Sequence, residues 1–221
     1  MKMNISFEKF SEYNFALYDQ ILFSDYKSFL EEKNINYKTL AVDLFGGARN
    51  SPILVSLNNV SMEDKEELYN YFFIEKETNY RHTFDRMNVF QNVIKTNLNM
   101  DEFSEILTKM MIYRGGYLFR YYDPRVILHL IIVRSKEIYI EDKNLRIWSD
   151  KYFKNIESVI LSLWGVKFIY NNKNTFSNNL KTNINIKDID LLNGMIKKKG
   201  GKYLDHLTGE QFFKNFKVTK G

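Results

Sequence analysis

The chain of 221 residues contains no cysteine. This absence excludes disulfide bonds, thiolate metal sites, redox motifs and cysteine nucleophiles together. Only three histidines are present, His82, His129 and His206, and they lie far apart in the sequence, so no structural zinc site is expected. We therefore expect no metal and no other cofactor.

Long hydrophobic runs are also missing. No stretch approaches the roughly 18 to 20 uncharged apolar residues that a membrane helix needs. The segment "MKMNISFEKFSEYNF" has acids and polar residues where a signal peptide needs an apolar stretch. We expect a soluble, cytoplasmic protein without stable membrane insertion.

Residues that can form a hydrophobic core are plentiful, since 44% of the chain is hydrophobic and 16% is aromatic. A large packed domain is therefore expected. The net charge of +5 is unevenly placed, because nine lysines and only four acids lie from residue 181 onward. The rest of the chain is neutral, which argues against a nucleic-acid-binding surface there. Nucleic-acid binding through the basic tail stays open as an alternative.

Strand and helix patterns alternate along the chain as far as Arg134, which favours a sheet with packed helices. Ser24, Ser61 and Asn99 are candidate N-caps for the helices that follow them. Strands are predicted at 15–19, in "YKTLAVDLF" before Gly46, and at 53–57, 89–96 and 117–122. Helices are predicted after Ser24, at 62–73, at 100–110 and after Pro124. Gly46 and Gly47 predict a turn rather than a dinucleotide loop.

The second half of the chain has weaker patterns. "VILSLWGVKFIYNN" indicates two short strands or a buried run around Gly165, and the asparagine-rich residues 171–183 form the best linker candidate. We therefore predict an α/β (α+β) fold: a mixed β-sheet with packed helices in residues 1–170, then a small helical lobe at 184–221.

Catalytic motifs fail one by one. "GMIKKKGGKY" lacks the spacing of a phosphate-binding loop, no G-x-S-x-G elbow is present, and the pair His82 and Asp85 is a motif common by chance. The chain is therefore predicted not to be an enzyme and to have no catalytic residues.

The stretch "YLFRYYDPRVILHL" places charged residues between two apolar runs, and these charges need an explanation. Asp123 before Pro124 is typical of a strand end followed by a capped helix start. Arg125 in the first helical turn is opposed by the helix dipole, so it needs a carboxylate partner or a functional reason. Alternation along a strand places Arg120 in an apolar row, where Asp123 or Asp19 would be its ion-pair partner. An ion-paired corner and a functional site both remain possible.

"LFRYYDPRVILHL" resembles the signature of the type VI secretion effector-chaperone (adaptor) family, also called Tap or TEC. Further pieces in the same order are similar to that family: "ALYDQ", "SPILVSL", "VFQNVIKTNLNMDEFSEILTKM" and "LWG". The resemblance covers roughly residues 15–170. One difference is "ESVILSLWG", where many relatives carry Gly-Pro before the tryptophan.

The resemblance implies a non-enzymatic adaptor that binds the N-terminal region of a toxin effector and helps load it onto the VgrG spike. It also implies an α/β lobe followed by a smaller helical lobe. The family's motif positions fall on Asp19, Arg120, Tyr121, Tyr122, Asp123, Pro124, Arg125 and Trp164. The alternative from another class is a small hydrolase or nucleotide-processing enzyme that uses Arg120, Asp123 and Arg125.

Overall fold

The computed structural model describes residues 5–73, 89–113, 117–124, 126–127, 130–131, 143–163 and 166–172. Three of the sequence predictions lie outside these residues: nearly all of the 171–183 linker, the helical lobe at 184–221, and the pair His82 and Asp85. The candidate residues Arg125 and Trp164 lie outside them as well.

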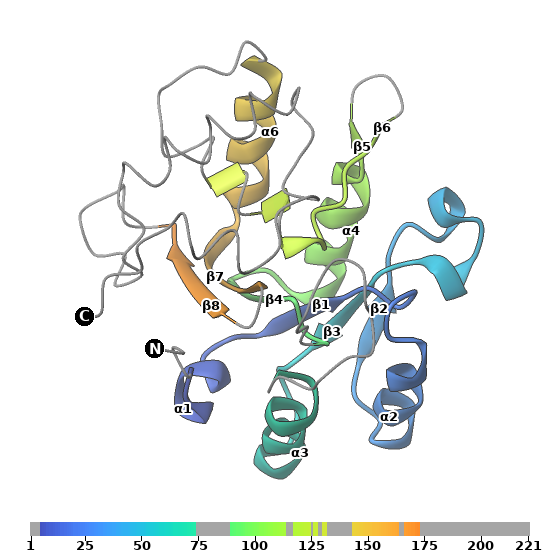
Figure 1. Cartoon of the computed structure of the whole chain (residues 1–221), viewed down its shortest axis with the longest axis vertical. Helices are drawn as coiled ribbons and strands as arrows, with labels where there is room; N and C mark the ends of the chain where they lie inside the picture. Colours follow the sequence, from blue (N-terminus) through green and yellow to red (C-terminus); the bar gives the residue numbers. More distant parts are fainter. Residues whose placement is uncertain are drawn as a thin grey trace.

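A six-stranded sheet forms the centre of the protein, in the order β2-β3-β1-β4-β7-β8 (Figure 1). Its strands are β1 (Phe15–Tyr18), β2 (Tyr37–Thr39), β3 (Ile53–Ser56), β4 (Asn92–Thr96), β7 (Ile156–Leu163) and β8 (Val166–Asn171). The expected α+β class is confirmed. The sheet is more regular than the mixed sheet we expected, since every described pairing within it is antiparallel.

Helices cover both faces of this sheet (Figure 1). The helices of one face are α1 (Phe7–Ser11), α2 (Lys27–Glu32) and α3 (Met62–Leu68), and those of the other are α4 (Met100–Met110) and α6 (Lys143–Phe153). Shorter elements are the 3₁₀ turns η1 (Ser24–Tyr26), η2 (Val42–Phe45) and η3 (Ala48–Asn50), and the π-helical segment η4 (Tyr69–Phe73). The strands β5 (Ile112–Tyr113) and β6 (Tyr117–Leu118) form a separate two-stranded ribbon. None of the helices in the described residues is long and apolar enough to cross a membrane.

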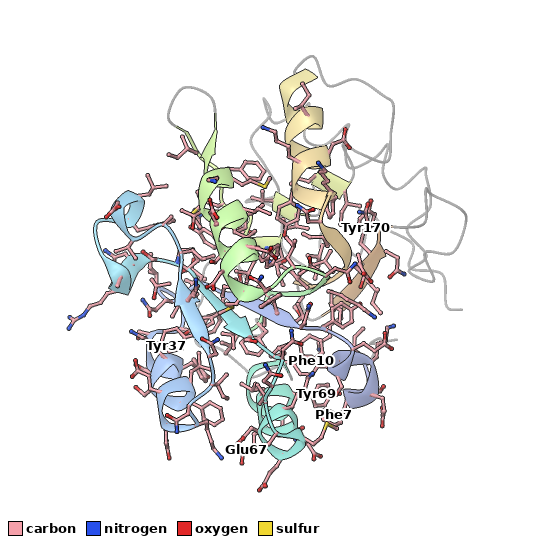
Figure 2. All side chains as sticks on the ribbon, turned by 180° about the vertical axis from the view of Figure 1, so that it is seen from behind. Phe7, Phe10, Tyr37, Glu67, Tyr69 and Tyr170 are labelled. Atoms are coloured by element: carbon pink, nitrogen blue, oxygen red, sulfur yellow. The ribbon has the colours of Figure 1, made fainter. Side chains whose placement is uncertain are left out.

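The core has two parts because side chains alternate along buried strands. In β1, Phe15 and Leu17 join the cluster under α4 and α6, while Ala16 and Tyr18 join the cluster over α1, α2 and α3. Figure 2 labels Phe7, Phe10 and Tyr69, whose rings meet between α1 and α3. The ring centroids of Phe7 and Tyr69 are 5.6 Å apart. All four β1 residues are buried, and β1 lies between β3 and β4 inside the sheet.

Local signals account for most helix starts. The Ser61 hydroxyl accepts a hydrogen bond from the Asp64 N–H at 3.0 Å, and Asn99 forms a capping box with Glu102, as predicted. The prediction for Ser24 was wrong. Residue 24 opens the 3₁₀ turn η1, and α2 begins later without a side-chain cap.

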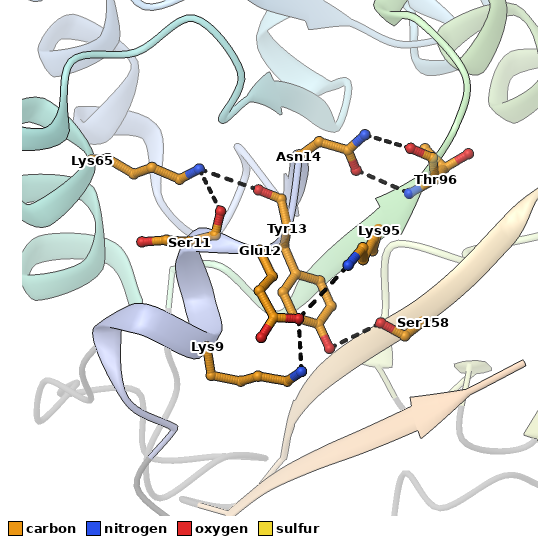
Figure 3. Close-up of polar contacts among 9 residues, drawn as sticks. All are labelled: Lys9, Ser11, Glu12, Tyr13, Asn14, Lys65, Lys95, Thr96 and Ser158. Atoms are coloured by element: carbon orange, nitrogen blue, oxygen red, sulfur yellow. Dashed lines mark hydrogen bonds and ion pairs between the residues drawn. The ribbon is translucent and has the colours of Figure 1, made fainter.

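Polar contacts hold the N-terminal segment to the sheet (Figure 3). The Asn14 side chain and the Thr96 backbone exchange two hydrogen bonds, and the Ser158 hydroxyl donates to the Tyr13 hydroxyl at 3.0 Å. The Lys65 ammonium donates to the backbone oxygens of Ser11 at 2.9 Å and Tyr13 at 3.5 Å. Lys65 therefore links α3 to the carboxyl end of α1.

Candidate functional site

The segment after β6 turns where the sequence predicts a strand. Regular pairing ends at Leu118, because the Tyr121 N–H donates to the Phe119 oxygen at 3.0 Å and the Asp123 N–H donates to the Arg120 oxygen at 2.9 Å. Tyr121 and Tyr122 are therefore both buried instead of alternating between two faces. The predicted strand over residues 117–122 is thus wrong beyond Leu118, since local turn bonds replace a sheet partner.

The predicted helix start at Pro124 is present. The backbone oxygen of Asp123 accepts hydrogen bonds from the N–H groups of Val126 at 3.0 Å and Ile127 at 3.3 Å. Residues 124, 126, 127, 130 and 131 are helical. Proline suits this first position because its nitrogen has no hydrogen to leave unpaired.

Two segments a hundred residues apart in sequence meet at this turn. Asp19 follows the last residue of β1, and its carboxylate lies within the electrostatic reach of both Arg120 and Asp123. Only 6% of Asp19 and 8% of Asp123 is exposed, whereas Arg120 is exposed. We call the group of Asp19, Arg120, Tyr122 and Asp123 the corner.

Asn92 of β4 holds the corner in place. Its Nδ2 atom donates to the backbone oxygens of Tyr122 at 2.6 Å and Tyr121 at 3.4 Å. Asn92 pairs with Leu17 of β1, so the turn is attached beside the strand that Asp19 follows. Sequence reasoning missed this residue. The signal was an asparagine inside the β-branched strand "VFQNVIKT", where a buried amide needs a partner.

Burial governs the electrostatics of Asp19. Removal from water raises the pKa of its carboxyl group above the ordinary value for aspartate. The backbone N–H of Ile21, which donates to Asp19 Oδ1 at 2.9 Å, and the charge of Arg120 both act to lower this pKa. The negative charge of Asp123 adds to the upward shift.

Arg120 differs from both sequence expectations. Its side chain is exposed instead of lying in an apolar row, and it forms no salt bridge with Asp19 or Asp123 in the part of the chain that the structure describes. The guanidinium lies over the ring of Tyr122, 5.7 Å from the ring centroid. Burial raises the pKa of Tyr122, and the nearby Arg120 acts against this shift. The expected ion pair is thus only a longer-range attraction.

The loop that contains η2 and η3 packs against the corner. The Gln20 side chain donates to the Ala48 backbone oxygen at 2.6 Å, and the ring centroid of Phe45 lies 6.1 Å from that of Tyr122. Gly46 and Gly47 have φ angles of 68° and 140°, which confirms the predicted turn, since such angles favour glycine. Around these contacts Ile21 and Leu44 remain 57% and 43% exposed.

The described site residues that the sequence predicted therefore fall into two groups, those with buried side chains and one with an exposed side chain. Tyr121 is fully buried against Tyr152 of α6, with ring centroids 5.9 Å apart, and Pro124 is buried as well. Asp19, Tyr122 and Asp123 are buried below the surface. Arg120 is the one described motif residue whose side chain a partner reaches without rearrangement of the fold.

The described ranges contain no group of three or more histidine, cysteine, aspartate or glutamate side chains that could hold a metal ion. What the corner offers chemically is an exposed guanidinium on a rigid base, which suits binding of an anionic group. Comparisons with family models, with curated proteins and with solved structures found no match to this chain.

Proposed function

We propose that this chain is a non-enzymatic adaptor that binds the N-terminal region of a type VI secretion toxin and helps load it onto the VgrG spike. One observation carries the proposal. The pieces "ALYDQ" and "LFRYYDPR", which resemble the adaptor family separately, come together at the corner through Asp19, Arg120 and Asp123. A motif whose separated parts converge at one place supports a shared structural or binding role.

The arrangement of buried and exposed groups suits binding without chemistry. Asn92 and the helix start at Pro124 fix the turn, so its backbone cannot shift freely when a partner binds. A preorganised surface loses less conformational entropy on association than a flexible one. The buried carboxylates of Asp19 and Asp123 then serve to hold the turn, and Arg120 presents its charge to the partner.

In this proposal the adaptor acts in the cytoplasm of the producing cell. It keeps the toxin stable and soluble until the toxin reaches the spike. Neither a cofactor nor a nucleic acid takes part in the proposed role.

Co-expression tests the proposal. The chain, carrying an affinity tag, is produced together with the toxin and the VgrG protein encoded beside its gene, and the complexes are purified on the tag. We expect the toxin to co-purify and its yield in the soluble fraction to fall when the adaptor is omitted. If neither the toxin nor VgrG associates with the tagged chain, the proposed function is wrong.

A further inference from the structure

Arg120 is a surface cation held in a defined position. Its guanidinium lies 5.7 Å from the Tyr122 ring centroid, and the Tyr122 ring is itself held against Phe45. Contact with an aromatic face orients an arginine side chain, so less rotamer freedom is lost when a ligand binds. Within the described residues this ordered cation has no salt-bridge partner.

The ligand that best fits such a group is a carboxylate. A guanidinium presents planar N–H donors whose spacing matches the two oxygens of one carboxylate, and the charge strengthens both bonds. Asp19 and Asp123, the two carboxylates of the corner, are buried, whereas Arg120 is exposed. An approaching partner therefore meets the cation before it meets either acid.

Apolar side chains are exposed on the two loops that pack against the corner. Six large hydrophobic side chains are exposed in the described part of the chain, and three of them, Ile21, Val42 and Leu44, belong to these loops. The Ile21 N–H contacts the Asp19 carboxylate, and Leu44 precedes the residue whose ring meets Tyr122. Exposed apolar groups on loops that contact the residues around a surface cation are typical of a protein-binding surface.

We infer that this surface binds a cargo segment in which an aspartate or glutamate lies next to apolar side chains. The acid of the segment pairs with Arg120, and its apolar neighbours contact Ile21 and Leu44. The inference rests on the proposed adaptor function and adds the chemistry of the segment that is recognised. Charge complementarity selects this occupant, because the exposed cation lacks an acidic partner in the described residues.

The test measures the affinity of the full chain for the purified N-terminal region of the neighbouring toxin by isothermal titration calorimetry. Arg120→Gln removes the charge, Arg120→Lys keeps the charge without the planar fork, and Ile21→Ser with Leu44→Ser reduces the apolar surface. Lys109→Ala is the matched control, since it removes an exposed cation of α4. Melting temperatures establish that each variant is folded. In the toxin region, each Asp and Glu is changed in turn to its amide.

We expect Arg120→Gln to weaken binding by about tenfold or more, Arg120→Lys to weaken it less, and Lys109→Ala to leave it unchanged. One amide substitution in the toxin should cause a similar loss, and should cause no additional loss when combined with Arg120→Gln. The paired serine variant should also weaken binding.

Three results overturn the inference and are distinguishable from one another. If the unaltered chain does not bind the toxin region, the proposed function fails and the inference fails with it. Should the folded Arg120→Gln variant bind with unchanged affinity, the inference fails while the adaptor function stands. Arg120-dependent binding of a 20-nucleotide single-stranded RNA, with toxin binding independent of Arg120, assigns the cation to nucleic acid instead.

Discussion

The amide nitrogen Nδ2 of Asn92 lies 2.6 Å from the backbone oxygen of Tyr122, which attaches the turn before Pro124 to strand β4. This contact joins the central sheet to the segment that carries the motif. The position of Arg120 therefore depends on a buried asparagine in another part of the chain.

Replacement of Asn92 by alanine should destabilise the protein. The change removes the donor to the oxygens of Tyr121 and Tyr122, and it leaves a cavity at a fully buried position. We expect the free energy of unfolding to fall by about 2 kcal/mol, measured by urea denaturation. Asn58→Ala, at an exposed position, is the control and should change stability by less than about 0.5 kcal/mol. Equal stability of the Asn92→Ala and unaltered proteins would contradict the anchoring role.

Substitutions of Asp123 distinguish the structural interpretation of the corner from the enzymatic one. Asp123 directly precedes the helix that begins at Pro124, a position where a side-chain acceptor and a negative charge are both favourable. Asp123→Ala should therefore lower the free energy of unfolding by about 1 kcal/mol or more, and Asp123→Asn, which keeps an acceptor oxygen, should cost less.

A hydrolase or nucleotide-processing enzyme predicts a different outcome for the same variants. There, Asp123→Asn would abolish turnover of a substrate while the melting temperature hardly changes. Detection of such an Asp123-dependent activity in the purified protein would contradict the adaptor account, and unchanged stability of Asp123→Ala would contradict the structural role.

Asp19 should give the protein a distinctive pH dependence. Its folded-state pKa is raised, chiefly by burial, so the folded protein holds this proton more tightly than the unfolded chain does. The stability linked to Asp19 is then fully present below the ordinary aspartate pKa and is lost as the pH rises through the higher folded value. Acids with lowered pKa values, such as Glu12 and Asp64, act in the opposite direction, so only a comparison with a variant isolates Asp19.

Asp19→Asn provides that comparison, because its amide oxygen still accepts from the Ile21 N–H. The stability of the variant relative to the unaltered protein should increase between pH 3.5 and pH 7, measured by urea denaturation at both pH values. A difference that stays constant with pH, or that changes in the other direction, would show that burial does not control the titration of this carboxyl group.

Lys65 should contribute far more to the stability of the fold than Lys9, which Figure 3 also shows. The Lys65 ammonium is buried and donates to two backbone oxygens at the end of α1, while Lys9 forms an exposed ion pair with Glu12. Lys65→Ala should lower the free energy of unfolding by about 2 kcal/mol and expose α1 to proteases, whereas Lys9→Ala should cost less than about 0.5 kcal/mol. Similar losses in both variants would mean that Lys65 does not hold α1.

The parts of the fold that follow local rules were predictable from sequence. β1, β3 and α4 have clear hydrophobic patterns, and Ser61 and Asn99 are caps with strong local signals. The helix α6 was not predicted, because its apolar residues are few and mixed with charged ones. Ser24 failed as a cap because a 3₁₀ turn precedes α2.

The candidate site was predictable in composition but not in geometry. The pattern around Pro124 indicated a helix start, and the structure has one there. The exposure of Arg120 depends on turn bonds that compete with strand pairing, and the anchor at Asn92 is a contact between residues about thirty positions apart. Neither can be obtained from the periodicity of one segment, because both depend on which segments meet in the fold.

We propose, as the central point, that the chain binds the N-terminal region of a type VI secretion toxin. The most direct measurement is size-exclusion chromatography with light scattering on the two purified proteins, separately and mixed. The account predicts a new peak whose mass equals the sum of whole numbers of both chains. Two unchanged peaks at micromolar concentrations of each protein would contradict it.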